Sequence, residues 1–517
     1  MKKLLTWAIL LAALLIAVPV SADPGTLYVD DDDPTCGGNS PCYPTIQAAI
    51  NAASAGDTIN VAAGTYPEQL VIDRAGITLQ GDESYPMVQP ALGDCNKYDT
   101  VISVKADNIT LRGLDISNAR GVVDLQTCGH IEHHGIWDGS WTVGQPGLTV
   151  DDCKFHDIEH GVRSYGDEFT VTNSEFYRLG RTGVYASGYG ASSPLLMTVK
   201  NNWFHDYIPV WKENHGVHVK YDGRVGKVSY NYMSGMRMGI AYYNGGPKPG
   251  FGQMVFRHNT FDLDYDLDGG TKPMTMGISL YGTGANADNI LIQDNIFANA
   301  WWYAIYQEGA TIAGSITVDN NLFYNNYWHY WPDFQYPHQW FGDDTRAQAG
   351  WTGGEPGFTF TNNLSAQDPL FKLEGAGPEA QWALQCGSPA LQSASDGSNI
   401  GAWQGQPVCV IEVTIDIKPG SYPNSINLGS MGVVPVALLT TDDFDATAVD
   451  PVTVLFAGAS PLRWTTEDVD GDGDLDLLFH FETQQLDLVE SSTEATLTGT
   501  TFGGQAIQGT DTVNIVP

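Results

Sequence analysis

A short strand-like unit recurs along the middle of the chain, and this repetition constrains the fold more than any other feature. In each unit an apolar β-former is followed five residues later by Phe or Met, and successive units lie 21 to 36 residues apart. Repetition at such a period is typical of a solenoid in which each repeat forms one coil. The units are residues 149–155, 170–176, 198–204, 227–233, 255–261, 291–297 and 317–323.

The position two residues before the final Phe or Met forms a column of mostly Asn residues. Stacked amides can hydrogen-bond to one another along a solenoid and satisfy the polar groups of a buried turn. We therefore predict a structural Asn ladder, in which the first residue, a Cys, is a small buried residue and not a reactive thiol. The column consists of Cys153, Ser174, Asn202, Asn231, Asn259, Asn295 and Asn321.

A second strand follows each unit and begins with Gly or Ala before Val or Ile, as in Gly161-Val162 and Gly216-Val217. Side chains alternate along a strand, so a Val that points into the coil leaves the next residue, and the one two further on, pointing outward. The outward face is then expected to carry Arg163, Tyr165, Tyr185, Ser187, His218, Lys220, Tyr243, Ser279, Tyr281, Tyr306 and Glu308.

The N-terminus has the pattern of a cleaved secretion signal. Lys2 and Lys3 precede an apolar run over residues 4–18, which is too short to span a bilayer, and small residues end at Ala22. We expect cleavage after Ala22 and a secreted mature chain (residues 1–22 being the signal peptide) without a transmembrane segment. Export permits disulfides, and the sequence-near pairs are Cys36–Cys42, Cys95–Cys128 and Cys386–Cys409.

Several motifs lie on either side of the repeats. Before them stand an amphipathic stretch at 45–53, Gly56-Asp57-Thr58 and Gly64-Thr65-Tyr66; after them stand Asp368-Pro369-Leu370-Phe371, Cys386-Gly387-Ser388-Pro389-Ala390 and Ile400-Gly401-Ala402-Trp403. These segments resemble the entry and closing segments of the pectin-lyase-like β-helix superfamily. The resemblance implies an all-β fold, a right-handed single-stranded parallel β-helix over residues 23–408, with an N-terminal cap helix.

Beyond the repeats, short β-runs broken by Pro-Gly and Gly-Gly turns predict a smaller C-terminal β-sandwich domain over residues 409–517. One of its loops matches the first nine positions of an EF-type calcium loop, although the twelfth position is Phe479 in place of the bidentate Glu. We predict a bound Ca²⁺ because crowded carboxylates require neutralisation. The expected ligands are Asp468, Asp470, Asp472, Asp474 and Asp476.

The charge balance bears on the partner. A net charge of −36 argues against nucleic acid, because a polyphosphate backbone normally requires a broad basic surface. However, the stretch from Lys154 to Arg257 holds 12 of the 24 Lys and Arg residues against 8 acidic residues. A local basic zone in an acidic protein suits an anionic polysaccharide or cell-surface glycan.

The predicted catalytic cluster combines His215, His218 and Lys220 with Arg163 and Tyr185 on neighbouring coils. In the superfamily that the chain resembles, this strand commonly forms the floor of the substrate groove. A polysaccharide lyase needs a base for the proton α to a uronate carboxyl group and a cation for the charge that develops there. Lys220 or His218 is the candidate base and Arg163 the candidate cation. The expected substrate-binding residues are Tyr243, Tyr281, Tyr306, Glu308 and Trp137.

Two alternatives stay open beside a secreted polysaccharide lyase that acts on uronate-containing glycans. A glycoside hydrolase of the same fold would need paired carboxylates several ångströms apart, for which Glu308, Asp222 and Asp138 are candidates. A non-catalytic glycan-binding protein would use the aromatic residues of the same face without turnover.

Overall fold

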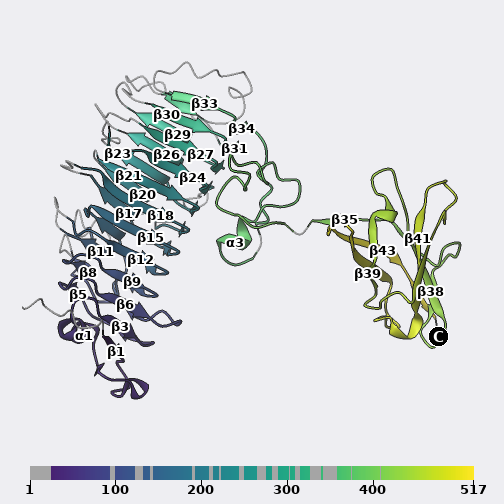
Figure 1. Cartoon of the computed structure of the whole chain (residues 1–517), viewed down its shortest axis with the longest axis horizontal. Coiled ribbons are helices and arrows are strands. Elements are labelled where there is room, and N and C mark those ends of the chain that lie inside the picture. Colours follow the sequence, from purple (N-terminus) through teal and green to yellow (C-terminus); the bar gives the residue numbers. More distant parts are fainter. Residues whose placement is uncertain are drawn as a thin grey trace, which may run out of the picture. The chain divides into compact units, whose positions relative to one another are not determined.

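The repeated units form coils whose strands stack in three long sheets (Figure 1). The computed structural model describes residues 25–93, 99–122, 132–139, 144–188, 193–208, 214–220, 223–243, 250–264, 275–281, 289–301, 303–308, 315–326, 339–341, 358–373, 375–407 and 409–516.

Sheet 1 has 13 strands, and neighbours in it are parallel. It contains the first strand of each repeated unit. In spatial order the strands are β2 (Cys42–Tyr43), β1 (Thr26–Val29), β3 (Thr58–Val61), β6 (Thr78–Gly81), β9 (Thr110–Arg112), β12 (Leu148–Asp151), β15 (Glu168–Thr172), β18 (Leu195–Lys200), β21 (Arg224–Ser229), β24 (Met254–Arg257), β27 (Ile290–Gln293), β30 (Ile316–Asp319) and β33 (Phe358–Thr361).

Sheet 2 has 11 parallel strands and contains the Phe or Met that ends each unit. Its strands are β34 (Leu364–Ser365), β31 (Leu322–Tyr324), β28 (Ile296–Ala298), β25 (Thr260–Asp262), β22 (Tyr232–Ser234), β19 (Trp203–His205), β16 (Glu175–Tyr177), β13 (Lys154–His156), β10 (Asp115–Ser117), β7 (Met87–Val88) and β4 (Thr65–Tyr66).

Sheet 3 has 10 strands and contains the second strand of each repeat. Its pairs are parallel except for the last, in which β32 runs antiparallel to β29. The strands are β32 (Gln339–Phe341), β29 (Tyr303–Glu308), β26 (Met276–Tyr281), β23 (Met238–Tyr243), β20 (His215–Lys220), β17 (Thr182–Ser187), β14 (His160–Ser164), β11 (His134–Asp138), β8 (Thr100–Val104) and β5 (Leu70–Ile72).

The three sheets enclose one continuous apolar core, so the predicted right-handed parallel β-helix is confirmed. Within it the Phe residues of the repeats stack ring on ring, with centroids 4.7 Å apart between Phe155 and Phe176 and 4.8 Å apart between Phe261 and Phe297. Strand spacing of about 4.8 Å sets this distance, because each coil adds one strand to each sheet. Identical residues in successive coils therefore lie on top of one another.

The Asn ladder is confirmed. The Asn259 side chain donates to Asn295 Oδ1 at 2.9 Å, and its own oxygen accepts from the Asn231 backbone and side chain. Each ladder amide also donates to a backbone carbonyl of a preceding coil, such as Val228 O for Asn259. Cys153 is buried and is not in a disulfide, and burial raises the pKa of its thiol to about 12. The column continues to Asn363, which the sequence repeats did not reveal.

Helix α1 (Ile46–Ala52) lies at the N-terminal end of the coils, as the cap-helix prediction requires. Thr45 begins it by accepting the Ala48 N–H through its side chain, and the Glu68 carboxylate accepts the N–H groups of Ile46 and Gln47. These contacts satisfy donors that a helix N-terminus leaves free. Ile46, with Ala49 and Ile50, belongs to the β-helix core.

The closing segment packs on the outer face of sheet 2. It contains the short helix α3 (Pro378–Gln381), and Trp382 after it donates to Asp262 and stacks on Tyr232. Further along, Asp396 accepts from Arg257, which also pairs with Asp294. The segment is thus joined to the coils by hydrogen bonds and ion pairs.

The chain divides into two compact units, and the second consists mainly of residues 405–516. It has its own apolar core between two four-stranded sheets, which agrees with the predicted smaller C-terminal β-domain. The domain boundary between residues 408 and 409 stays a prediction. The strands are β35 (Val410–Glu412), β43 (Ala506–Thr512), β42 (Glu494–Thr501) and β39 (Val449–Phe456); then β36 (Ile415–Ile417), β38 (Val433–Leu438), β41 (Asp476–Glu482) and β40 (Arg463–Glu467); and the pair β37 (Ser425–Asn427) with β44 (Asn514–Val516).

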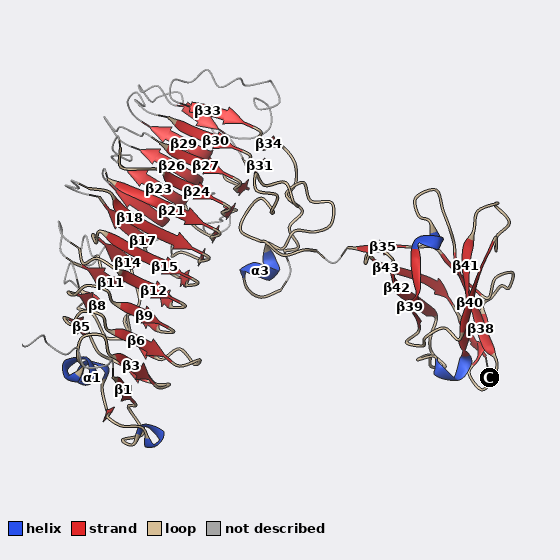
Figure 2. Ribbon diagram, in the orientation of Figure 1, coloured by secondary structure: helices blue, strands red, loops and turns tan. Residues whose placement is uncertain are grey.

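Helices contribute little to either unit, as Figure 2 shows. Besides α1 and α3 there are 3₁₀ turns at Cys36–Gly38, Ala446–Ala448 and Thr483–Gln485. Across the described ranges, no helix is long and apolar enough to cross a membrane.

Two predicted disulfides, Cys36–Cys42 and Cys386–Cys409, are present. The predicted signal segment, the Cys95–Cys128 pair and Asp222 lie outside the described residues, as do the side chains of Tyr281 and Glu308.

Candidate functional site

The outward face of sheet 3 carries the predicted site residues, which lie in columns across neighbouring strands. Strand pairing aligns Arg163 with Tyr185, and Tyr185 with His218, on three consecutive strands. Trp137 precedes them in the same column, which continues through Ala241 and Ser279 to Tyr306. A neighbouring column aligns Ser187, Lys220 and Tyr243 with the backbone positions of Tyr281 and Glu308. The alternation read from the sequence therefore placed these residues correctly.

Arg163 is the centre of the site. It is only 4% exposed, and its Nε and Nη2 atoms donate to the Tyr165 hydroxyl at 3.1 and 2.7 Å. Its Nη1 atom lies 2.6 Å from a Glu132 carboxylate oxygen, and its guanidinium carbon lies 4.5 Å from the Tyr185 ring centroid. Burial alone would lower the pKa of Arg163, but Tyr165 and Glu132 raise it overall. The guanidinium is a fixed, buried positive charge.

Glu132 joins two arginines and was not foreseen from the sequence. Its second carboxylate oxygen accepts from Arg181 Nη1 at 3.1 Å. Burial would raise the pKa of Glu132, but Arg163 and Arg181 lower it overall. With two guanidinium groups and one carboxylate, the group has a net positive charge. Neither Glu132 nor Arg181 lies in a strand of the repeat, so periodicity gave no signal for them.

Four imidazoles extend along the same face. The rings of His134 and His160 are stacked with centroids 5.0 Å apart, and His215 and His218 lie 4.6 Å apart. Burial, and then nearby positive groups, lower the pKa of His134, His160 and His218 well below the usual value. The same causes lower the pKa of His215 to about 3. All four are therefore neutral at physiological pH, and their surroundings disfavour the protonated form.

A contact chain joins the cation to one of these bases. The Tyr185 ring lies between Arg163 and His218, with its centroid 5.0 Å from that of the His218 imidazole. His218 in turn faces the Tyr243 ring, 6.1 Å away, and the Lys220 ammonium lies 5.1 Å from that ring. Arg163, Tyr185, His218 and Lys220 are thus brought together on adjacent coils.

Three other predicted site residues, Trp137, Tyr306 and Asp138, have different surroundings. Trp137 packs on Arg163 at 5.3 Å and on His134, so it supports the guanidinium. Tyr306 is 8% exposed and stacks on Tyr303, three strands beyond His218 in the sheet order. Asp138 does not belong to the outward face. Its side chain is fully buried, accepts from Ser164 at 2.6 Å, and has a pKa raised by burial.

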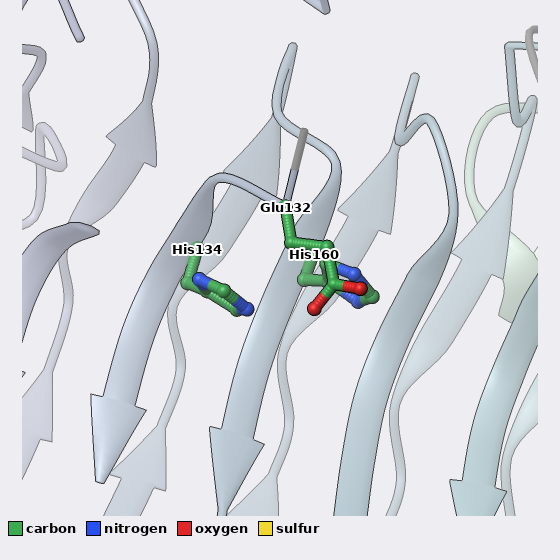
Figure 3. A group of neighbouring side chains, drawn as sticks. All are labelled: Glu132, His134 and His160. Carbon is green, nitrogen blue, oxygen red and sulfur yellow. The ribbon is translucent and has the colours of Figure 1, made fainter. Parts of the chain in front are cut away.

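Glu132, His134 and His160 form a group of possible metal ligands, with ligand atoms within 4.8 Å of one another (Figure 3). However, Arg163 Nη1 already lies 3.1 Å from His134 Nε2 and 2.6 Å from Glu132. A dication there would meet two guanidinium charges at short range in a buried setting, where charge repulsion is strong. The group does not fit a cation, and we assign no metal to it.

The acidic loop between β40 and β41 has carboxylate oxygens of Asp468, Asp470 and Asp476 within 4.8 Å of one another. Asp468 accepts the N–H groups of Gly471 and Gly473, and Asp476 accepts those of Val469 and Thr440. Carboxylates held this close by a compact loop are a suitable ligand set for a hard cation.

Comparison with known protein families shows to which family the chain belongs. A family model described as a right-handed β-helix region matches residues 73–364, which is more than half of the chain. The chain belongs to the right-handed β-helix family. Membership establishes the coil architecture and leaves the reaction open, since one fold hosts many functions.

A comparison with solved structures found several matches to this β-helix chain. A pectin methylesterase from Aspergillus niger is 16% identical over 58% of this chain and 86% of that one, with a TM-score of 0.32. The protein XylC in complex with xylose is 9% identical over 87% and 94%, with a TM-score of 0.38. A PL6 alginate lyase in complex with a trisaccharide is 10% identical over 75% and 96%, with a TM-score of 0.36. At these values the likenesses carry no evidence about activity. No curated protein matches the chain.

The sequence of this β-helix protein does contain a signal for three of the four histidines of the site. His precedes Gly at the first position of β11, β14 and β20, in His134-Gly135, His160-Gly161 and His215-Gly216. Strand pairing places His134 beside His160, then Thr182 and His215. A search for repeated dipeptides at strand starts would have found these three histidines.

Proposed function

We propose that this chain is a secreted polysaccharide lyase that acts on uronate-containing glycans. The observation that carries the proposal is the contact chain Arg163–Tyr185–His218, with the neutral His218 imidazole close to a cationic group. Elimination requires a base and positive charge at neighbouring positions along the substrate.

The proposed chemistry assigns one role to each group. His218, or Lys220 beside it, removes the proton α to the uronate carboxyl group, and the electron pair forms the new carbon–carbon double bond. The bond to the leaving glycosidic oxygen breaks, and the Tyr185 hydroxyl supplies the proton that this oxygen takes up. The Arg163 charge stabilises the negative charge that develops on the carboxyl group.

Electrostatics supports an anionic substrate. Arg163 and Arg181 share the single carboxylate of Glu132, so a uronate approaches a site with net positive charge in an otherwise acidic chain. A charge of that sign concentrates anionic ligands locally. A bound carboxylate would also raise the pKa of His218 and make it a stronger base.

The hydrolase alternative has weaker support. Inverting and retaining mechanisms both need two carboxyl groups flanking the scissile bond. Asp138 points into the core, and Glu132 is held by two arginines. The glycan-binding alternative is separated from the lyase by the test for turnover.

The decisive experiment is an assay for the ultraviolet absorbance of unsaturated uronates with alginate, pectate and glycosaminoglycans. We expect a rise in absorbance with one of these substrates and a 10²–10⁴-fold lower rate in His218→Ala, as for loss of a general base. Lys227→Ala is the matched control for Lys220→Ala, because Lys227 is exposed on sheet 1. A rise that is unaffected by His218→Ala and Lys220→Ala would contradict the assigned residues.

Absence of any rise would contradict the lyase proposal itself. Isothermal titration of the same glycans would then distinguish a binding protein, which retains affinity for them, from a hydrolase that acts on other substrates. A hydrolase would release reducing ends without the ultraviolet band.

Secretion is part of the proposal. The two disulfides Cys36–Cys42 and Cys386–Cys409 suit an oxidising compartment, in agreement with the signal-like N-terminus. N-terminal sequencing of the exported protein should begin at Asp23. A chain that stays in the cytoplasm with residues 1–22 attached would contradict it.

We also propose that the loop from Asp468 to Asp476 binds Ca²⁺. Support comes from the close carboxylates of Asp468, Asp470 and Asp476. The Asp472 N–H lowers the pKa of Asp470, but desolvation and the neighbouring carboxylates of Asp472 and Asp476 raise it overall. A cation would relieve that repulsion.

A further inference from the structure

Strand β40 is an unprotected edge of the smaller unit. It is the last strand in the order β36–β38–β41–β40, and all five of its residues are exposed. An open edge presents unpaired N–H and C=O groups that can pair with another strand. Natural proteins usually shield such an edge with Pro, a bulge or inward-pointing charge. The sequence Arg-Trp-Thr-Thr-Glu contains no Pro, and the irregularity at its start, where Leu462 and Arg463 both face His480, leaves the rest of the strand in register.

The backbone groups that face the open edge can be identified. β40 is antiparallel to β41, and the Lys418 N–H donates to Pro435 O at 2.8 Å, so residue 435 of β38 bonds toward β36 and residue 436 bonds toward β41. In antiparallel pairing, alternate residues direct both backbone groups to the same neighbour. Residue 479 of β41, opposite residue 436, therefore bonds toward β38, and residues 478 and 480 bond toward Thr465 and Arg463 of β40, which leaves Trp464 and Thr466 to bond outward.

The side chains of β40 are also incompletely covered. Trp464 lies on the core side of its sheet, opposite the fully buried Phe479, yet it is 41% exposed. Leu462, just before the strand, is 56% exposed. This apolar area on the core side of the edge is therefore available for contact with another strand.

We propose that β40 pairs with β40 of a second copy of this chain, antiparallel about Thr465, to form a two-fold dimer with one continuous eight-stranded sheet. Two-fold pairing about Thr465 places Arg463 opposite Glu467 of the second copy, and the reverse contact follows by symmetry. On the other face Trp464 meets Thr466 of the second copy. The outward backbone groups of Trp464 then pair with those of Thr466 of the second copy, and the reverse pairing follows by symmetry.

The charges of β40 favour pairing with β40 of a second copy over pairing with an unrelated acidic strand. Residues 409–516 hold 17 Asp and Glu but only Lys418 and Arg463 as bases. An edge with one base and one acid at its two ends matches its own reversed copy, with opposite charges facing each other twice. In that arrangement the two acidic loops, which follow Glu467, lie at opposite ends of the paired strands.

The test is sedimentation velocity of the full chain over a range of concentrations, with Ca²⁺ present. We expect a reversible shift from monomer to dimer mass. Arg463→Glu and Glu467→Arg should each weaken dimerisation roughly tenfold, because an opposite-charge contact becomes a like-charge one at two symmetric places. The double variant R463E/E467R should restore it, since the opposite charges are again aligned.

Backbone pairing has its own test. Thr466→Pro removes an outward N–H and should abolish the dimer, whereas Thr466→Val keeps that N–H and should retain it. Circular dichroism and the melting temperature show whether each variant is folded, and the double charge swap remains informative if a single variant is not. A chain that stays monomeric at every concentration, or a dimer that none of these variants changes, would overturn the proposal.

Discussion

Each residue of the Asn ladder satisfies several buried groups at once. Asn259 donates to Asn295 and to the Val228 carbonyl, and it accepts the Asn231 N–H. Asn259→Ala leaves these partners buried without a hydrogen bond, at about 1–3 kcal/mol for each unsatisfied group. We expect a lower free energy of unfolding in urea. Asn60→Ala, on the outer face of sheet 1, is the control and should change little; equal losses in both variants would refute the ladder's special role.

A second residue-scale prediction concerns pH. His205 lies 2.9 Å from Asp206 and 3.1 Å from Glu175, on either side of its ring. Burial would lower the pKa of His205, but hydrogen bonds with Asp206 and Glu175 raise it overall. The charged form is thus favoured in the folded state, which stabilises the fold by about 1.4 kcal/mol for each unit of pKa rise.

The direction of this pH dependence follows from whether the folded or the unfolded state binds the proton of His205 more tightly. The stabilisation is complete below the unfolded pKa, near 6.5, and is lost as the pH rises through the higher folded pKa. The difference in urea midpoint between wild type and His205→Gln should therefore be large at pH 5.5 and smaller at pH 8.5, two conditions chosen about one unit or more from that value. A difference that grows with pH would show that the imidazole is neutral in the fold.

What the sequence could predict at this scale depends on periodicity. Arg163, Tyr185 and His218 were found because strand alternation fixes their direction once Val162 points inward. Glu132 and Arg181 were not, because their positions depend on how turns between strands fold. Asp138 differs from them, because it lies on β11 and alternation from the inward Ile136 already places it inside, beside Ser164.

At the scale of elements, the Gly at the second position of β11, β14, β17, β20, β23 and β26 has a packing role. A Cβ on Gly277 would lie 2.5 Å from the Phe297 ring and 2.5 Å from the Ala304 carbonyl oxygen. The sequence revealed the recurring Gly but not its cause, because the contact joins sheet 3 of one coil to sheet 2 of the next. Glycine thus allows the inner Phe stack to approach the backbone.

Gly277→Ala should accordingly destabilise the β-helix by about 1–3 kcal/mol, the usual cost of overpacking a filled core. Gly503→Ala is a matched control, because its Cβ would meet only Thr501 at an ordinary 3.5 Å. Urea unfolding followed by circular dichroism measures both. If Gly277→Ala were as stable as wild type, the Phe stack would have to be looser than these distances imply.

At the scale of the whole molecule, the two units have separate apolar cores, so we expect two unfolding transitions in calorimetry. If the acidic loop binds Ca²⁺, chelation should lower only the transition of the smaller unit. A ligand at 100 times its Kd stabilises the folded state by about 2.7 kcal/mol. Asn259→Ala should lower only the other transition.

The loop is tested by a pair of variants with the same change in charge. Asp470→Asn, in the group of close carboxylates, should remove most of the effect of chelation. Asp450→Asn, on β39 of the same unit, should leave that effect intact. Transitions that move together would mean that the two cores unfold as one. A smaller-unit transition that chelation does not move would exclude a structural ion, and the backbone N–H groups bound to Asp468 and Asp476 would then account for the order of the loop.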